Sequence, residues 1–298
     1  MLERTQERFI TAKNGKEYRI LISWPQGEAP PEGHAITYVL DGDELFPMMT
    51  GILRVQAGTE KLSNHNAITP GIIVAVGYRE ASSRNVDYTP AAPPGPPETY
   101  VDGRPYPKQE SGGAEAFYTF LEEELKPAIA KDYSVNTKRQ SLLGNGYGGL
   151  FCLHVLYNHP ESFQTYVASS PSVWWNNRYI LQEEAAFAAR AKEKPLNATL
   201  LITVGDLEQS LTEHEYSWPD KPREEHALKT SRRRMVDNTR EMYWRLKKLE
   251  TAGLKTAYHI FPGESHKSVI PMAVSRALPY VFPPVAPKKE ARSADASR

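Results

Sequence analysis

The chain has 298 residues, 40% of them hydrophobic, and its 36 lysines and arginines are balanced by 36 aspartates and glutamates. The formal charge of zero gives no electrostatic reason to expect a nucleic acid or membrane partner, and the single cysteine, Cys152, excludes disulfides and cysteine zinc sites. Because residues 1–8 lack the apolar stretch of a signal peptide and no apolar run approaches the roughly 18 residues of a membrane span, we expect a soluble cytoplasmic protein.

The first part of the chain alternates between predicted strands and one helix before it enters a long loop. Apolar and polar residues alternate on both sides of Asn14-Gly15, which predicts a hairpin over 8–22. Apolar runs predict strands over 34–40 and 71–76, and a helix is predicted between them over 44–56. Residues 79–113 are rich in proline and tyrosine and show no sustained periodicity. A loop of this length is either a functional lid or a disordered insert, and its aromatic residues favour an ordered lid.

The second part continues the alternation as far as the last predicted helix. Its periodicity predicts helices over 114–130, 150–158, 180–194, 230–252 and 269–281, and strands over 140–143, 165–169, 198–204 and 256–261. We interpret 205–225 as an irregular polar loop, the basic run 232–234 as a solvated helix face, and 283–298 as a disordered tail. The alternation predicts an α/β fold in a single domain over 1–282, with a mostly parallel sheet covered by helices on both faces.

The glycine-rich turn over 144–149 is the most informative motif in the sequence. It follows a predicted strand and opens a predicted helix, and its glycines fit both the G-x-G-x-x-G of dinucleotide-binding folds and the G-x-S-x-G nucleophile elbow of α/β-hydrolases. The nucleotide alternative lacks both the acidic residue after the next strand and the lysine of a P-loop, so we expect no cofactor. The elbow alternative fits its context, but Gly146 stands where the nucleophilic serine belongs. Cys152, in the following helix, fits a core position better than the role of a substitute nucleophile.

Polar residues at the carboxyl ends of two predicted strands supply the other parts of a hydrolase site, because ligands bind at this edge of parallel sheets. Asp206 and Glu208 follow the strand over 198–204, and His266 follows the last strand. Elbow, acid and histidine therefore occur in the chain order of an α/β-hydrolase triad. Glu208 is the preferred partner of the histidine, with Asp206 as the alternative.

Backbone groups and aromatic residues are further candidates at the same edge of the sheet. The N–H groups of Tyr147 and of Gly42 or Asp43 are candidates for an oxyanion hole. Trp174 and Trp175 follow a predicted strand, where two rings suit the wall of a binding pocket, although both residues could equally be core.

The chain resembles the α/β-hydrolases related to siderophore trilactone esterases, including the enterobactin esterases, from the hairpin to the last helix. The resemblance rests on the segments 39–42, 86–90, 112–114, 122–127, 169–175, 204–208 and 261–266. It implies an α/β-hydrolase fold with His266 as the catalytic base and Glu208 as the best acid. It also aligns Gly146 with the catalytic serine and Asn145 with the histidine that commonly precedes that serine. At Lys267 the family often has glycine, which is a further departure.

Gly146 leaves three functions open. If this glycine is an engineered replacement of serine, the natural protein is a serine esterase. If it is native, covalent acyl transfer through this residue is impossible, and His266 beside an oxyanion hole would serve as general base in a non-hydrolytic condensation, cyclisation or elimination. In the third alternative the protein is a pseudoenzyme that only binds its ligand. Because Asn145 and Lys267 also depart from the family pattern, the sequence favours a native glycine. We expect the partner to be a small molecule, an aromatic or polyfunctional natural product.

Overall fold

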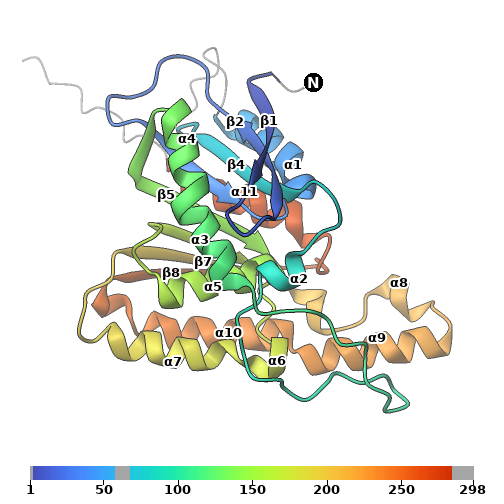
Figure 1. The fold of residues 1–298 in the computed structure, drawn as a ribbon. Coiled ribbons are helices and arrows are strands. Elements are labelled where there is room, and N and C mark those ends of the chain that lie inside the picture. The colour runs from blue at the N-terminus through green and yellow to red at the C-terminus, as the bar shows by residue number, and fades with distance from the viewer. Residues whose placement is uncertain (1–2, 58–67, 284–298) are drawn as a thin grey trace, which may run out of the picture.

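The apolar runs of the chain form one eight-stranded sheet in the computed structural model, which describes residues 3–57 and 68–283 (Figure 1). In spatial order the strands are β1 (Thr5–Thr11), β2 (Glu17–Ser23), β4 (Ile72–Tyr78), β3 (His34–Val39), β5 (Val135–Asn145), β6 (Thr165–Ser169), β7 (Ala198–Gly205) and β8 (Leu254–Phe261). The pairs β1–β2 and β2–β4 are antiparallel, and the remaining pairs are parallel. This sheet confirms the mostly parallel α/β architecture predicted from the sequence.

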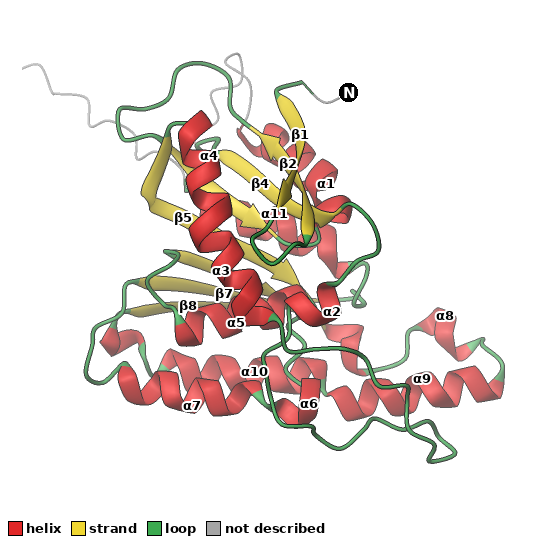
Figure 2. Ribbon diagram, in the orientation of Figure 1, coloured by secondary structure: helices red, strands yellow, loops and turns green. Residues whose placement is uncertain are grey.

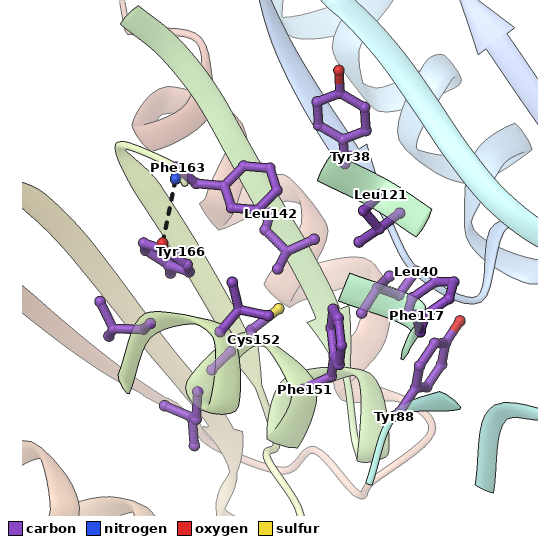
Figure 3. Packing of buried hydrophobic residues seen from close by; sticks show 14 of the residues in the cluster. Tyr38, Leu40, Tyr88, Phe117, Leu121, Leu142, Phe151, Cys152, Phe163 and Tyr166 are labelled. Carbon is purple, nitrogen blue, oxygen red and sulfur yellow. Dashed lines mark hydrogen bonds between the residues drawn. The ribbon is translucent and has the colours of Figure 1, made fainter. Parts of the chain in front are cut away.

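Helices cover both faces of the sheet (Figure 2). Residues of α1 (Gly42–Ala57) and α11 (Val269–Val281) form a core with one set of alternating strand residues. The opposite face is covered by α3 (Ala114–Phe120), α4 (Lys126–Asp132), α5 (Tyr147–Asn158), α7 (Ile180–Arg190) and α10 (Met235–Lys247). Cys152 is fully buried in this second core, where it lies beside Phe151 (Figure 3).

Five further elements belong to connections that follow the carboxyl ends of strands. They are α2 (Arg84–Asp87), α6 (Trp175–Arg178), α8 (Glu213–Tyr216), α9 (Asp220–Arg233) and the 3₁₀ turn Asp206–Gln209. A π-helical segment, Leu121–Leu125, joins α3 to α4, and the 3₁₀ turn Glu250–Ala252 precedes β8. In this described part of the chain, none of the helices combines the length and apolar character needed to cross a membrane. The predicted disordered tail lies outside the described residues except for Pro283.

Two predictions about the segment after β7 are wrong. The predicted polar loop over 205–225 contains α8 and the first turns of α9. The predicted helix over 230–252 is divided between α9 and α10, because Arg234 adopts a left-handed conformation with φ 46°. This conformation is unfavourable for a residue with a side chain. Asn238 Nδ2 compensates by donating to the Arg233 carbonyl oxygen at 2.9 Å, and Arg234 pairs with Glu241 at 2.8 Å.

The loop over 79–113 runs alongside α9, to which polar contacts tie it (Figure 1). Arg233 binds Glu98 through two hydrogen bonds of 3.0 and 2.7 Å, and the Val101 N–H donates to Glu225 at 3.0 Å. Thr99 and Pro105 form an isolated antiparallel bridge within the loop. These contacts hold the loop against α9 around Glu98 and Val101, and its role as a lid stays a prediction.

A buried histidine joins α3, α5 and α7. His154 Nδ1 lies 2.8 Å from Glu183 Oε2, and Nε2 lies 2.9 Å from Glu115 Oε1. The second contact lacks hydrogen-bond geometry, so it acts mainly as a charge pair. Burial works to lower the pKa of His154, but the two carboxylates outweigh burial and raise the pKa to about 9.

We expect the free energy of unfolding to fall as the pH rises from about 6.5 to about 9. The pKa of His154 is higher in the folded protein than in the unfolded chain. The stabilisation that His154 contributes is therefore complete at pH values below its pKa in the unfolded chain, and it is lost as the pH rises through its pKa in the folded protein. It amounts to roughly 3 kcal/mol at most, and we expect about half of that because Glu115 is partly exposed and screened by solvent. Urea unfolding at several pH values should show this slope in the parent protein and not in His154→Gln. Equal slopes would contradict the prediction.

Candidate active site

The elbow turn joins β5 to α5 at the carboxyl edge of the sheet. Gly146 has φ 61° and ψ −115°, a conformation that side chains rarely adopt. A Cβ atom at Gly144 would lie 2.4 Å from the Gly148 backbone, so the first glycine of the turn is required by close packing. Gly146 is different, because the nearest neighbour of a Cβ atom there is a side chain at 3.4 Å. The turn has the strained geometry of a nucleophile elbow, with room for a side chain at its apex.

His266 is the side chain nearest to that apex. A Cβ atom at Gly146 would lie 3.4 Å from His266 Nε2 and 3.6 Å from Cε1. The other ring nitrogen, Nδ1, lies 2.6 Å from Glu208 Oε2. One nitrogen therefore faces the elbow while the other is held by a carboxylate, which is the arrangement of a general base and the acid that orients it.

Glu208 is held by hydrogen bonds in a buried position. Its Oε1 accepts from the Ser170 hydroxyl at 2.5 Å and from the Gly205 N–H at 2.7 Å. Asp206 turns away and accepts from the Gly263 N–H at 2.8 Å. The structure thus places Glu208, and not the alternative Asp206, next to the histidine.

Arg84 lies on the other side of the elbow, where no sequence pattern had indicated a site residue. Its Nε and Nη2 atoms bind the two carboxylate oxygens of Asp41 at 2.8 and 3.0 Å, and Nη2 lies 3.4 Å from the Asn145 carbonyl oxygen. The same Nη2 would lie 3.9 Å from a Cβ atom at Gly146. Burial works to lower the pKa of Arg84, but Asp41 outweighs burial and raises the pKa further. A permanent positive charge therefore stands beside the apex of the elbow.

The oxyanion candidates all lie at helix N-termini, where the first N–H groups have no acceptor within the helix. Tyr147 begins α5 and lines the pocket described below, whereas Gly42 and Asp43 begin α1 and do not line it. The Asp43 carboxylate turns away to bind Arg19 at 2.8 Å. The wall at this point is made instead by Asp41, Glu44 and Leu45. An oxyanion role for Gly42 or Asp43 stays a prediction.

A pocket of about 650 Å³ contains the elbow and His266. Trp174 lines it with its ring 5.9 Å from the Tyr147 ring, and the Arg233 guanidinium carbon lies 3.6 Å from the Trp174 ring centroid. The loop over 79–113 adds Arg84, Asn85 and Gln109 to the lining. The interpretation of 232–234 as a purely solvated face is therefore wrong for Arg233, because α9 ends there and directs this side chain to the pocket.

The other two predicted binding residues have different surroundings. Asn145 lines the pocket, and its Oδ1 accepts from the Ser169 hydroxyl at 2.9 Å. Trp175 packs against the hydrophobic core and is not part of the lining. The expectation that both tryptophans form the wall is thus supported for Trp174 only. In residues 3–57 and 68–283, no group of three or more His, Cys, Asp or Glu side chains could hold a metal ion.

An elbow, a buried acid and a histidine at the carboxyl ends of β5, β7 and β8 in a mostly parallel sheet define the site of an α/β-hydrolase-type enzyme. The Esterase family profile matches residues 11–267. Ferri-bacillibactin esterase BesA of Bacillus subtilis is 38% identical over 95% of this chain and 91% of BesA. The siderophore triacetylfusarinine C esterase of Aspergillus fumigatus is 32% identical over 94% of each chain. The chain therefore belongs to the Esterase family.

Solved structures agree with this assignment. The BES protein from Bacillus cereus superposes with a TM-score of 0.76 at 33% identity, covering 95% of this chain and 97% of the other. The siderophore hydrolase EstA from Aspergillus nidulans superposes with a TM-score of 0.80 at 30% identity, covering 93% of this chain and 94% of EstA. The fold of this chain is accordingly that of the siderophore-esterase-like α/β-hydrolases.

Proposed function

We propose that this chain acts on an ester of a siderophore-type small molecule, with His266 as general base and without a covalent acyl-enzyme stage. Relatives that match nearly the whole chain are named as esterases of ferri-bacillibactin, triacetylfusarinine C and enterobactin, which supports this ligand class. One observation carries the rest of the proposal. His266 Nε2 lies 3.4 Å from the Cβ position of Gly146, a residue that has no nucleophilic atom.

In the proposed reaction His266 takes a proton from a water molecule, whose oxygen forms a bond with the ester carbonyl carbon. The carbonyl π electrons move to its oxygen, which is stabilised by the Tyr147 N–H and by the positive charge of Arg84. The tetrahedral intermediate then expels the alcohol, which takes the proton from the imidazolium, while Glu208 stabilises that cation. We expect slow turnover, because loss of a triad nucleophile lowers kcat by about a millionfold in a serine protease.

A second candidate is the non-hydrolytic reaction considered from the sequence. Here His266 takes a proton from a ligand carbon next to a carbonyl, which leads to condensation, cyclisation or elimination. The observation in its favour is the guanidinium of Arg84, whose Nη2 is 3.9 Å from the Cβ position of Gly146 and suits an enolate oxygen. Both candidates depend on the same base, and they differ in the source of the proton.

Incubation with enterobactin in H₂¹⁸O separates these candidates. Hydrolysis by water gives an acid product that carries one ¹⁸O atom, whereas condensation, cyclisation or elimination gives a changed ligand without that label. His266→Ala should slow either reaction by about 10²–10⁴-fold. The control is His259→Ala, since His259 lies on β8 and does not line the pocket. If the ligand binds and stays unchanged, the protein is a binding protein and the catalytic proposal is wrong.

The two tryptophans are expected to respond differently to truncation. Trp174→Ala should weaken binding of the same ligand by about tenfold with little change in melting temperature, because its ring lines the pocket. Trp175→Ala should lower stability by about 1–3 kcal/mol, because its partly buried ring packs on the core. Thermal unfolding and ligand titration of both variants measure these effects. Unfolding of both variants would place the wall of the pocket elsewhere.

A further inference from the structure

A second pocket, of about 620 Å³, is formed by α9, the segment before α9 and the loop over 79–113. Its aromatic lining comes from Tyr100, Tyr106 and Trp218. His226 and Lys229 of α9 line this pocket and also the pocket that contains Gly146. None of the three aromatic residues lines the pocket of the elbow, so this is a separate concavity that shares one wall with the candidate active site.

The two tyrosines of the second pocket are presented by a closed turn. Their ring centroids lie 4.1 Å apart. The Tyr100 N–H donates to the Arg104 carbonyl oxygen at 2.9 Å, and the Tyr106 N–H donates to the Glu98 carbonyl oxygen at 2.8 Å. Because the Glu98 carboxylate is itself bound to Arg233 of α9, the turn is fastened to the helix that forms the opposite wall. The rings are thus positioned before any ligand arrives, which lowers the entropic cost of binding.

Most charged groups of the second pocket already have partners. Arg104 pairs with Asp102 at 2.8 Å, and His226 pairs with Glu215 at 3.1 Å. The Glu225 carboxylate accepts the hydrogen bond from the Val101 N–H described above. These pairs leave little net charge on this part of the lining.

Two lysines of the lining remain without such partners. Among the described residues, neither Lys221 nor Lys229 forms a hydrogen bond or a close ion pair, although the charges of Asp102 and Glu98, respectively, act on them from further away. The Lys229 ammonium lies 5.9 Å from the Tyr106 ring centroid. Desolvation and, next, the nearby positive charge of Arg233 lower the pKa of Lys229, and together they outweigh the Glu98 carboxylate, which raises it. A bound anion would oppose both effects, so this ammonium is a ready acceptor for a negative group.

We propose that the second pocket binds an aromatic anion, such as an aryl carboxylate, with its ring against Tyr106 and Trp218 and its anionic group at Lys229. The rings account for the aromatic part, since offset or edge-to-face contacts favour a third ring, and the two unpaired ammonium groups account for the charge. The proposal does not depend on the reaction at Gly146.

Benzoate is the probe, with benzyl alcohol and cyclohexanecarboxylate as matched compounds that lack the charge and the aromatic ring, respectively. Ligand-observed NMR titration should give a dissociation constant for benzoate at least about fivefold lower than for either matched compound. Tyr106→Leu, Trp218→Leu and Lys229→Met should each raise the benzoate value by a similar factor. Lys248→Met, on the exposed surface just after α10, should leave it unchanged. Trp174→Leu tests whether benzoate lies in the first pocket instead, because Trp174 lines that pocket and not the second one.

Three results would overturn the proposal. The first is equal binding of the three compounds. The second is weakening by Trp174→Leu and not by the Tyr106 and Trp218 variants, which would place benzoate in the first pocket. The third is an unchanged benzoate affinity in Lys229→Met. Circular dichroism checks that each variant is folded. If either Tyr106→Leu or Trp218→Leu does not fold, the other variant still tests the aromatic wall.

Discussion

Gly146→Ser is expected to raise the rate of hydrolysis of a small activated ester, p-nitrophenyl acetate, by at least about a hundredfold. The Cβ position at Gly146 is 3.4 Å from His266 Nε2, so a serine hydroxyl falls within reach of the base. The φ of 61° makes a side chain there unfavourable by about 1–3 kcal/mol, which a protein of this size can tolerate. Steady-state release of p-nitrophenolate measures the gain, and mass spectrometry of the quenched variant should reveal an acetyl group on the introduced serine.

Gly146→Ala is the matched control for this substitution. It introduces the same Cβ atom and the same backbone strain but no hydroxyl, so its rate should stay at the level of the glycine protein. Adding His266→Ala to the serine variant should abolish the gain, because the hydroxyl would lose its base. Equal rates for folded serine and alanine variants would show that the elbow no longer has hydrolase geometry, and Gly146 would then belong to a different kind of site.

Glu208→Gln is expected to lower the kcat of the serine variant by about 10²–10⁴-fold, since the comparable change in a serine protease triad costs about 10⁴. The carboxylate faces the Ser170 hydroxyl, the Gly205 N–H and His266 Nδ1. An amide has a single acceptor oxygen, and its NH₂ group must face at least one of these groups. Either the NH₂ donates to Nδ1 of His266, which leaves the proton on Nε2 and removes the base, or a buried donor loses its acceptor. The second outcome costs about 1–3 kcal/mol of stability. Kinetics and thermal unfolding of the same variant therefore report on both effects.

Asp206→Asn is the control for the acid. Asp206 lies two positions earlier, accepts only from the Gly263 N–H among the groups around the site, and does not contact His266. When Asp206→Asn is added to the serine variant, we expect kcat to stay within about twofold of the value for the serine variant alone. If Asp206→Asn lowers kcat as strongly as Glu208→Gln, the acid has been assigned to the wrong residue.

The architecture, and the stretches of chain that contribute to the candidate site, could be predicted from local sequence patterns. Periodicity and turn residues are local properties, and they placed the strand over 165–169 and the helix over 269–281 as the structure has them. Close packing requires a glycine at position 144, and this glycine is part of the sequence motif from which the elbow was predicted. The order of elbow, acid and histidine pointed to residues that the structure brings together, because parallel strands carry their carboxyl ends to one edge.

Which side chains meet at this edge of the sheet could not be predicted in this way, because it depends on contacts between distant parts of the chain. Asp206 and Glu208 both follow β7, and a 3₁₀ turn directs one to Gly263 and the other to His266. Arg84 and Arg233 come from an aperiodic loop and from a helix end, and each is positioned by a carboxylate distant in the chain, Asp41 and Glu98 respectively. No local pattern encodes such contacts, because they depend on how the loop and α9 fold over the sheet.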